Sequence, residues 1–327
     1  MRNILLSCLI VFLILTACNN NNSNKRIAPN SSGRLNNLNV VIKNEKWQDT
    51  LGETLRSVFA ANAKGLPQQE PMHTLSQLPP KVFNGFARKN RNIIMVEQSP
   101  QPGFKIVKDS FSRPQNVFIF QGPNDRSIAQ VVQKNKDQAI SIINQTEIQE
   151  KQRRINKSPE KTGKLEEKLG IKLLFPTAYR YAKEGDDFVW MRKEIKNGSM
   201  ELLAYQVPLD RIDEDKNTIG SIIQVRDSIG EKYIPGPSEG THLATDETYA
   251  PYLFKTKVED KFAYQVKGVW DVEGAFMAGP FQMLVIRDKT NNRYLIVEGF
   301  VFKPSASKRN NIFEVESILN SVEFIKN

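Results

Sequence analysis

The fold is decided by one stretch, residues 281–302, which reads FQMLVIRDKTNNRYLIVEGFVF. Two apolar segments, at 281–287 and 294–302, have the length and the composition of β-strands. Asn291 and Asn292 lie between the two segments and are typical of a hairpin turn. The stretch therefore predicts an antiparallel β-hairpin.

Further predicted elements surround this hairpin in the second half of the chain. The pattern predicts strands at 171–175, 188–192, 201–207 and 262–272. Asn197-Gly198 is a strong turn signal between two of these strands. Isoleucine and valine at helical spacing predict a helix near 219–229 and a final helix that Ser307 caps. Runs of strands followed by a packed helix are typical of an α+β sandwich with a mainly antiparallel sheet.

The first half of the chain predicts a second sheet with long helices. The predicted strands are 38–42, 92–96, 104–107 and 117–120. An amphipathic helix at 46–62 is followed by a proline-rich loop at 66–80. A long helix at 126–155 has Asp125 as its expected N-cap. The fold class is therefore α+β, with two sheet-plus-helix domains.

The boundary between the two domains is expected near residue 157. Ser158-Pro159 has the residue types that begin a helix, and Gly170 the type that ends one. The sequence thus predicts an N-terminal domain at 38–157 and an antiparallel C-terminal domain at 158–327.

The N-terminus has the pattern of a lipoprotein signal peptide. The apolar run 4–15 is shorter than the roughly 20 residues that a spanning helix needs, and Leu15-Thr16-Ala17-Cys18 closes it as a lipobox. We expect a signal peptide at 1–17, lipid on Cys18 and an asparagine-rich tether at 18–37. No cofactor is expected besides this covalent lipid.

The lipid anchor gives the protein an expected location. Asn19 follows the cysteine, where an aspartate commonly retains lipoproteins in a Gram-negative inner membrane. The prediction is a bacterial cell-envelope protein, anchored to the membrane by its lipid at the periplasmic face of the outer membrane.

Composition excludes several kinds of chemistry. The chain has two cysteines, Cys8 and Cys18, so the body that follows the signal peptide has no free thiol for catalysis, zinc binding or a disulfide. It has two histidines, His73 and His242, too few for a histidine-rich metal site. The formal charge is +10, which suits anionic lipid, polyanionic glycan or an acidic partner. Nucleic acid is not an expected partner in this compartment.

Short strings along the chain resemble a family of bacterial envelope lipoproteins, domain-of-unknown-function family 4837. These strings are LPQQEP at 66–71, FVWMR at 188–192, VRDS at 225–228, IPGP at 234–237, FMAGPF at 276–281 and VEGFV at 297–301. The resemblance implies a lipoprotein and no catalytic activity. The order of elements in the second half also resembles photosystem-P-protein and Mog1-type α/β sandwiches, which mostly bind proteins or serve as assembly factors.

Two loops are the predicted binding surface. Pro and Gly fix the backbone of Pro235-Gly236-Pro237 and of Gly279-Pro280-Phe281, so each loop preorganises a surface. Arg192 and Arg226 are candidates to bind a carboxylate or phosphate, the alternative being a structural salt bridge to Glu298 or Asp227. Trp190 and Trp270 are predicted core residues of their strands.

No catalytic motif accompanies these loops. The leading hypothesis is a non-enzymatic envelope module that binds another protein or serves assembly. The alternative is a lipid- or glycan-binding protein, and a hydrolase would require two carboxylates that the fold brings together. The partner, the oligomeric state and a structural duplication of the two halves stay open.

Overall fold

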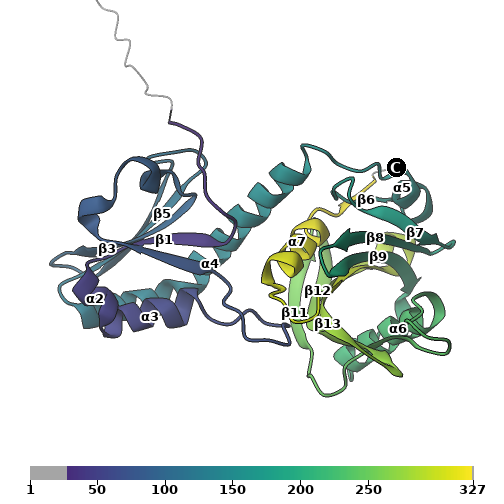
Figure 1. Ribbon diagram of the computed structural model, residues 1–327. Coiled ribbons are helices and arrows are strands. Elements are labelled where there is room, and N and C mark those ends of the chain that lie inside the picture. The colour runs from purple at the N-terminus through teal and green to yellow at the C-terminus, as the bar shows by residue number, and fades with distance from the viewer. Residues whose placement is uncertain (1–27, 326–327) are drawn as a thin grey trace, which may run out of the picture.

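The computed structural model describes residues 28–325 (Figure 1). The signal peptide and Cys18 therefore lie outside the described residues. The predicted α+β class is confirmed: a mixed sheet with helices is followed along the chain by a larger antiparallel sheet with helices.

The N-terminal domain is built on a five-stranded sheet. In chain order its elements are β1 (Asn37–Val41), α2 (Asn44–Gln48), α3 (Thr50–Phe59), β2 (Thr74–Leu78), η1 (Pro80–Val82), η2 (Gly85–Lys89), β3 (Asn92–Gln98), β4 (Gly103–Lys108), β5 (Asn116–Gly122) and α4 (Asp125–Ile155). The sheet order is β2-β1-β3-β5-β4, and only β4 runs antiparallel to its neighbour. Helices α3 and α4 bury apolar side chains against one face of the sheet (Figure 1).

Several predicted limits in this domain need correction. The single helix expected at 46–62 is two helices, because the Asp49 carboxylate accepts the Thr50 N–H at 2.7 Å and starts a new one. Strand β2 lies inside the predicted 66–80 loop and pairs with β1. The N-cap of α4 is Asn124, which accepts the Ser127 N–H at 2.9 Å, and Asp125 is the first helical residue.

The described part of the predicted tether is bound to the N-terminal domain. The Ser31 N–H donates to the Arg113 carbonyl at 2.9 Å, and the Ser32 N–H donates to the Lys89 carbonyl at 2.8 Å. The Asn36 N–H donates to a carboxylate oxygen of Glu147 at 2.8 Å. Residues 31–36, predicted as part of the tether, are therefore held against the N-terminal domain.

The C-terminal domain is built on an eight-stranded antiparallel sheet. In chain order its elements are α5 (Gly163–Leu169), β6 (Ile171–Lys172), β7 (Arg180–Glu184), β8 (Phe188–Ile195), β9 (Gly198–Pro208), η3 (Leu209–Arg211), α6 (Thr218–Tyr233), β10 (His242–Thr245), β11 (Tyr252–Val258), β12 (Lys261–Glu273), β13 (Ala275–Asp288), η4 (Lys289–Asn291), β14 (Arg293–Phe302), α7 (Arg309–Leu319) and β15 (Glu323–Phe324). The order is β10-β12-β13-β14-β9-β8-β7, and β11 also pairs with β12.

Helices cover both faces of this sheet. Helices α5 and α7 pack on one face, where Val315 and Ile318 meet Leu202 and Leu284. Helix α6 packs on the other face, where its Ile222 and other apolar residues meet the second core of the domain. The predicted hairpin at 281–302 is confirmed as β13 and β14, and Asn292 takes the left-handed conformation (φ 51°) at its turn.

Two helix starts in this domain differ from the prediction. Ser158-Pro159 does not begin α5, because the Glu160 N–H donates to the Phe175 carbonyl at 2.8 Å and holds this segment extended. Gly170 ends α5 as predicted, with φ 67°. Ser307 does not cap α7: Lys308 takes the N-cap position, and the Ser307 hydroxyl donates to the Glu70 carboxylate.

The two domains meet along α4 and α7. Lys151 on α4 forms an ion pair with Glu314 on α7 at 2.6 Å, and the Gln152 amide donates to the Ser317 carbonyl at 2.9 Å. Glu70 of the N-terminal domain accepts the Lys308 N–H at 2.8 Å. Figure 1 shows the C-terminal half of α4 extending from its own sheet toward α7.

Candidate functional site

An apolar pocket lies on the α6 face of the C-terminal sheet, beside the segment that follows α6. Its volume is about 300 Å³, at the low end of the range for small-ligand sites. We call it the tryptophan pocket. It is lined by Trp190, Arg192, Ser199, Glu201, Ile234, Pro235, Gly236, Pro237, Leu243, Trp270, Val272, Met277, Phe300 and Phe302.

The Pro235-Gly236-Pro237 loop is a fixed wall of the tryptophan pocket. The Gly236 N–H donates to the Thr241 carbonyl at 2.8 Å, and the Leu243 N–H donates to the Ile234 carbonyl at 3.1 Å. A Cβ on Gly236 would lie 2.3 Å from the Thr241 hydroxyl, so only glycine fits this close approach. The loop is therefore preorganised by its own backbone hydrogen bonds.

Aromatic rings form the floor of the pocket. The Trp270 ring centroid lies 5.2 Å from that of Phe300 and 6.2 Å from that of Phe302. Trp270 is 2% exposed, and its buried Nε1–H has no acceptor among the described residues. This nitrogen lies against Gly279 of β13, 3.0 Å from where a Cβ on that glycine would stand, so it is turned toward the sheet.

One buried carboxylate gives the pocket a polar side. Glu201 is 2% exposed and accepts the Trp190 Nε1–H at 2.8 Å. The Arg192 guanidinium lies 3.4 Å from the other carboxylate oxygen of Glu201. Burial raises the pKa of Glu201, although the Trp190 N–H and the Arg192 charge act in the opposite direction.

This raised pKa predicts how stability depends on pH. Below the ordinary pKa of 4.5, Glu201 is protonated in both the folded and the unfolded chain. As pH rises above 4.5 the unfolded chain loses this proton first, so the wild type should lose stability relative to Glu201→Gln. Urea unfolding of both proteins from pH 4 upward measures the difference, with Glu231→Gln at an exposed site on α6 as the control. A stability difference that does not change with pH would contradict the assignment.

The structure brings half of the predicted binding surface together. Arg192, Pro235, Gly236 and Pro237 all line the tryptophan pocket. The stretch 279–281 is not a loop, because it lies within β13 and all three residues are buried. A Cβ on Gly279 would lie 2.1 Å from the Val301 carbonyl, so this glycine permits close approach of β14.

Pro280 and Phe281 have structural positions in the sheet. The pairing of β13 with β14 starts at Phe281, so Pro280 lies where the strand pairs with β12 alone. A strand tolerates proline at such a place because the missing N–H is not needed for a second ladder. The Phe281 side chain is fully buried in the core under α6.

Arg226 forms the structural ion pair that was the alternative to ligand binding. Its Nε lies 2.9 Å from a carboxylate oxygen of Glu298, and its Nη1 lies 2.8 Å from the Thr245 hydroxyl. Its guanidinium carbon lies 4.1 Å from the centroid of the Phe281 ring. Arg226 is 1% exposed and does not line the tryptophan pocket.

The aromatic floor of the pocket was not predicted from the sequence. Trp270 is buried as predicted, but it also lines the pocket, as does the half-buried Trp190. One sequence pattern could have indicated this floor. Phe300 and Phe302 are two residues apart on one strand, so both rings lie on the same face of the sheet. No sequence pattern marked Glu201 as a pocket residue, because its burial depends on the pairing of β8 with β9.

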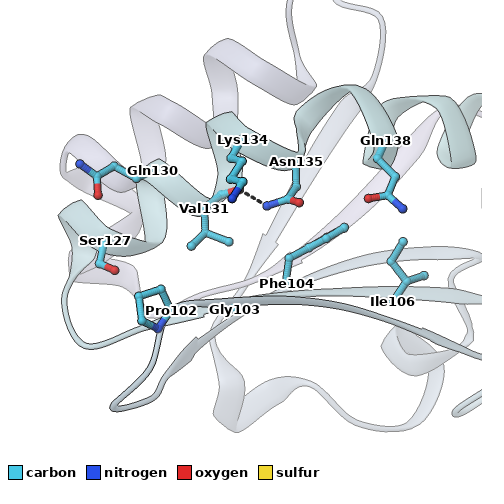
Figure 2. Close-up of a pocket in the computed structure, with 10 residues that line it drawn as sticks. All are labelled: Pro102, Gly103, Phe104, Ile106, Ser127, Gln130, Val131, Lys134, Asn135 and Gln138. Atoms are coloured by element: carbon cyan, nitrogen blue, oxygen red, sulfur yellow. Dashed lines mark hydrogen bonds between the residues drawn. The ribbon is translucent and has the colours of Figure 1, made fainter.

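A second, shallower groove lies in the N-terminal domain. Figure 2 shows it between α4 and the edge strand β4, with Phe104 and Val131 among the residues that line it. Its volume is about 670 Å³, and none of its ten lining residues is buried. Lys134 is the one charged residue in this lining, so the groove lacks the buried polar groups that distinguish the tryptophan pocket.

Neither a metal cluster nor a spanning helix is found in the described chain. Among residues 28–325, no group of three or more His, Cys, Asp or Glu side chains could hold a metal ion. Within the same range, no helix is long and apolar enough to cross a membrane.

The fold and the pocket define an α+β protein with a preformed apolar site. Residues 158–321 match the family model described as a domain of unknown function (DUF4837), and the chain belongs to that family. Residues 31–156 match a second model, also a domain of unknown function (DUF8532). No curated protein matches the chain.

The solved structures to which the chain is similar are distant in sequence and align with less than half of it. The Ran-binding protein Mog1p of Saccharomyces cerevisiae is 10% identical, with a TM-score of 0.31 over 48% of this chain and 91% of its own. LpqN of Mycobacterium tuberculosis, described as involved in cell envelope biogenesis, is 10% identical, with a TM-score of 0.27 over 46% of this chain and 81% of its own.

Proposed function

We propose that the protein is a lipid-anchored, non-catalytic envelope module that binds an apolar segment of another envelope protein in the tryptophan pocket. The observation that carries the proposal is the preformed apolar pocket itself, with a loop wall held by its own backbone hydrogen bonds and a floor of aromatic rings. A segment of a partner would place an apolar side chain among these rings.

The rim of the pocket supports binding of a protein segment. Met277 on β13 and Phe302 on β14 line the pocket and are only partly buried. Partly exposed apolar side chains at a pocket leave apolar surface that a partner could bury. Arg192, 44% exposed in its side chain, adds a charged group at the same rim.

A photoreactive side chain in the pocket tests the proposal. Met277→p-benzoylphenylalanine should give one dominant protein adduct on irradiation of living cells, because this position lines the pocket. The matched control is the same replacement at Val82, which is 53% exposed in the N-terminal domain and should give no such adduct. Equal adducts from both positions would contradict a specific site.

A lipid or glycan ligand is the second candidate. The aromatic rings that line the pocket could also pack on a sugar ring or an acyl chain. The same irradiation distinguishes the candidates, because Met277 adducts with lipid or saccharide would carry little added mass and no partner peptide.

The lipid anchor predicts selective labelling of one cysteine. Cells fed an alkynyl fatty acid should label the wild type, and Cys18→Ser should remove the label because Cys18 ends the lipobox. Cys8→Ser is the matched control and should keep the label, since Cys8 lies in the signal peptide. Gel fluorescence after dye coupling measures the label, and retention of full signal in Cys18→Ser would contradict the anchor.

A further inference from the structure

A second pocket lies where the two domains meet. This interdomain cavity has a volume of about 390 Å³ and is lined from α4, from strands β11 to β13 and from α7. Lys64 and Asn144 contribute from the N-terminal half, and Gln282 and Arg309 from the C-terminal half. Ligand sites occur preferentially at domain interfaces, and this volume is within their usual range.

Gln282 is a buried polar side chain that lines this cavity. It is 4% exposed, and its Oε1 has no hydrogen-bond donor among the described residues. On the same face of β13, Leu284 and Ile286 are core residues under α7. A glutamine at the end of an apolar face, with its carbonyl unpartnered, therefore points to a ligand that carries an N–H or O–H group.

The charges that line the cavity are mostly positive. Lys267 pairs with Glu316 at 2.8 Å, which leaves Lys64 and Arg309 as the excess charge. Lys64 Nζ lies 5.2 Å from the centroid of the Phe254 ring, and no ion pair found within residues 28–325 includes it. The Glu70 carboxylate, outside the lining, accepts the Arg309 backbone N–H at 3.0 Å, so Lys64 is the cation that chiefly favours an anionic ligand.

The remaining lining is apolar. It consists chiefly of Met72, Ile140, Ile148, Phe254, Ile312 and Phe313. We infer that the interdomain cavity binds a small amphipathic anion, with an acid group near Lys64 and Arg309, an apolar body among these side chains and a donor to Gln282. The inference does not rest on the tryptophan pocket, because the two sites share no lining residue.

Two fluorescent probes test the inference on the full chain carrying Cys18→Ala. The probe 8-anilinonaphthalene-1-sulfonate has an acid group, an apolar body and one N–H, and N-phenyl-1-naphthylamine lacks only the acid group. Lys64→Gln should weaken sulfonate binding about threefold to fivefold, as expected for loss of a partly exposed charge pair, and leave the neutral probe unchanged. Lys255→Gln, an exposed lysine of β11 next to Phe254, is the control and should change neither affinity.

Two more variants show which of the two pockets the probe occupies. Gln282→Met should weaken both probes, because both use their N–H at this carbonyl. Met277→Glu places a negative charge in the tryptophan pocket and should leave binding unchanged. The inference is overturned if Lys64→Gln and Lys255→Gln behave alike, if Gln282→Met has no effect, if Met277→Glu abolishes binding, or if the sulfonate does not saturate.

Discussion

Replacing Arg226 with methionine is expected to lower the free energy of unfolding of the C-terminal domain by about 3–5 kcal/mol. Arg226 is 1% exposed and Glu298 is 0% exposed, so the variant would leave a buried carboxylate without its guanidinium. The same change would remove the packing of the guanidinium on Phe281 and its hydrogen bond to Thr245. Urea unfolding followed by tryptophan fluorescence measures the loss.

Two controls separate the charge from the packing. The double variant Arg226→Met with Glu298→Leu replaces the whole pair by apolar groups and should recover most of the lost stability. Arg287→Met removes a pair with Glu214 whose side chains are 28% and 27% exposed, and it should cost less than about 1 kcal/mol. Equal losses in Arg226→Met and Arg287→Met would contradict the assigned role of the buried pair.

Arg91→Ala is expected to destabilise the N-terminal domain by about 3–5 kcal/mol, since it leaves a buried partner charge. Arg91 and Glu147 are 1% and 0% exposed and share two hydrogen bonds of 3.0 Å. Arg91 also donates to the carbonyls of Gly33 and Arg34 at 3.1 Å and 2.9 Å. The variant should therefore release the segment before β1, which limited proteolysis would detect as early cleavage there.

A surface arginine of the same domain provides the control. Arg113→Ala removes a pair with Asp109 in which the arginine side chain is 74% exposed. Such pairs contribute little to stability, so this variant should unfold and be cleaved like the wild type. An Arg91→Ala protein as stable as Arg113→Ala would show that the buried pair does not hold the segment.

The sequence predicts the central strands better than the edge strands. The hairpin at 281–302 is apolar on both faces because helices cover both faces of the sheet, and this makes its strands easy to recognise. Strand β7 (Arg180–Glu184) lies at the sheet edge and has no buried residue, so no apolar pattern marks it. Strand β2 follows a proline-rich segment and is also at an edge, which favoured the loop prediction.

Only part of the tryptophan pocket could be predicted from the sequence. Gly and Pro predict a loop at 235–237, and there the backbone turns back so that the Gly236 N–H donates to the Thr241 carbonyl. The same two residue types at 279 and 280 have another cause, the close approach of β14 and the one-sided pairing of β13. Trp190, Glu201 and Trp270 come from three strands, so only the sheet order shows that they share one site.

The most direct test of a membrane-positioned binding module compares the Met277 cross-link in two forms of the chain. Cells would carry Met277→p-benzoylphenylalanine either with native Cys18 or with Cys18→Ala, and adducts would be identified by mass spectrometry after irradiation. The proposal predicts one dominant protein adduct with native Cys18 and its loss from the Cys18→Ala form. The same adduct at equal yield in both forms would contradict the need for the anchor, and no protein adduct in either form would contradict protein binding in the tryptophan pocket.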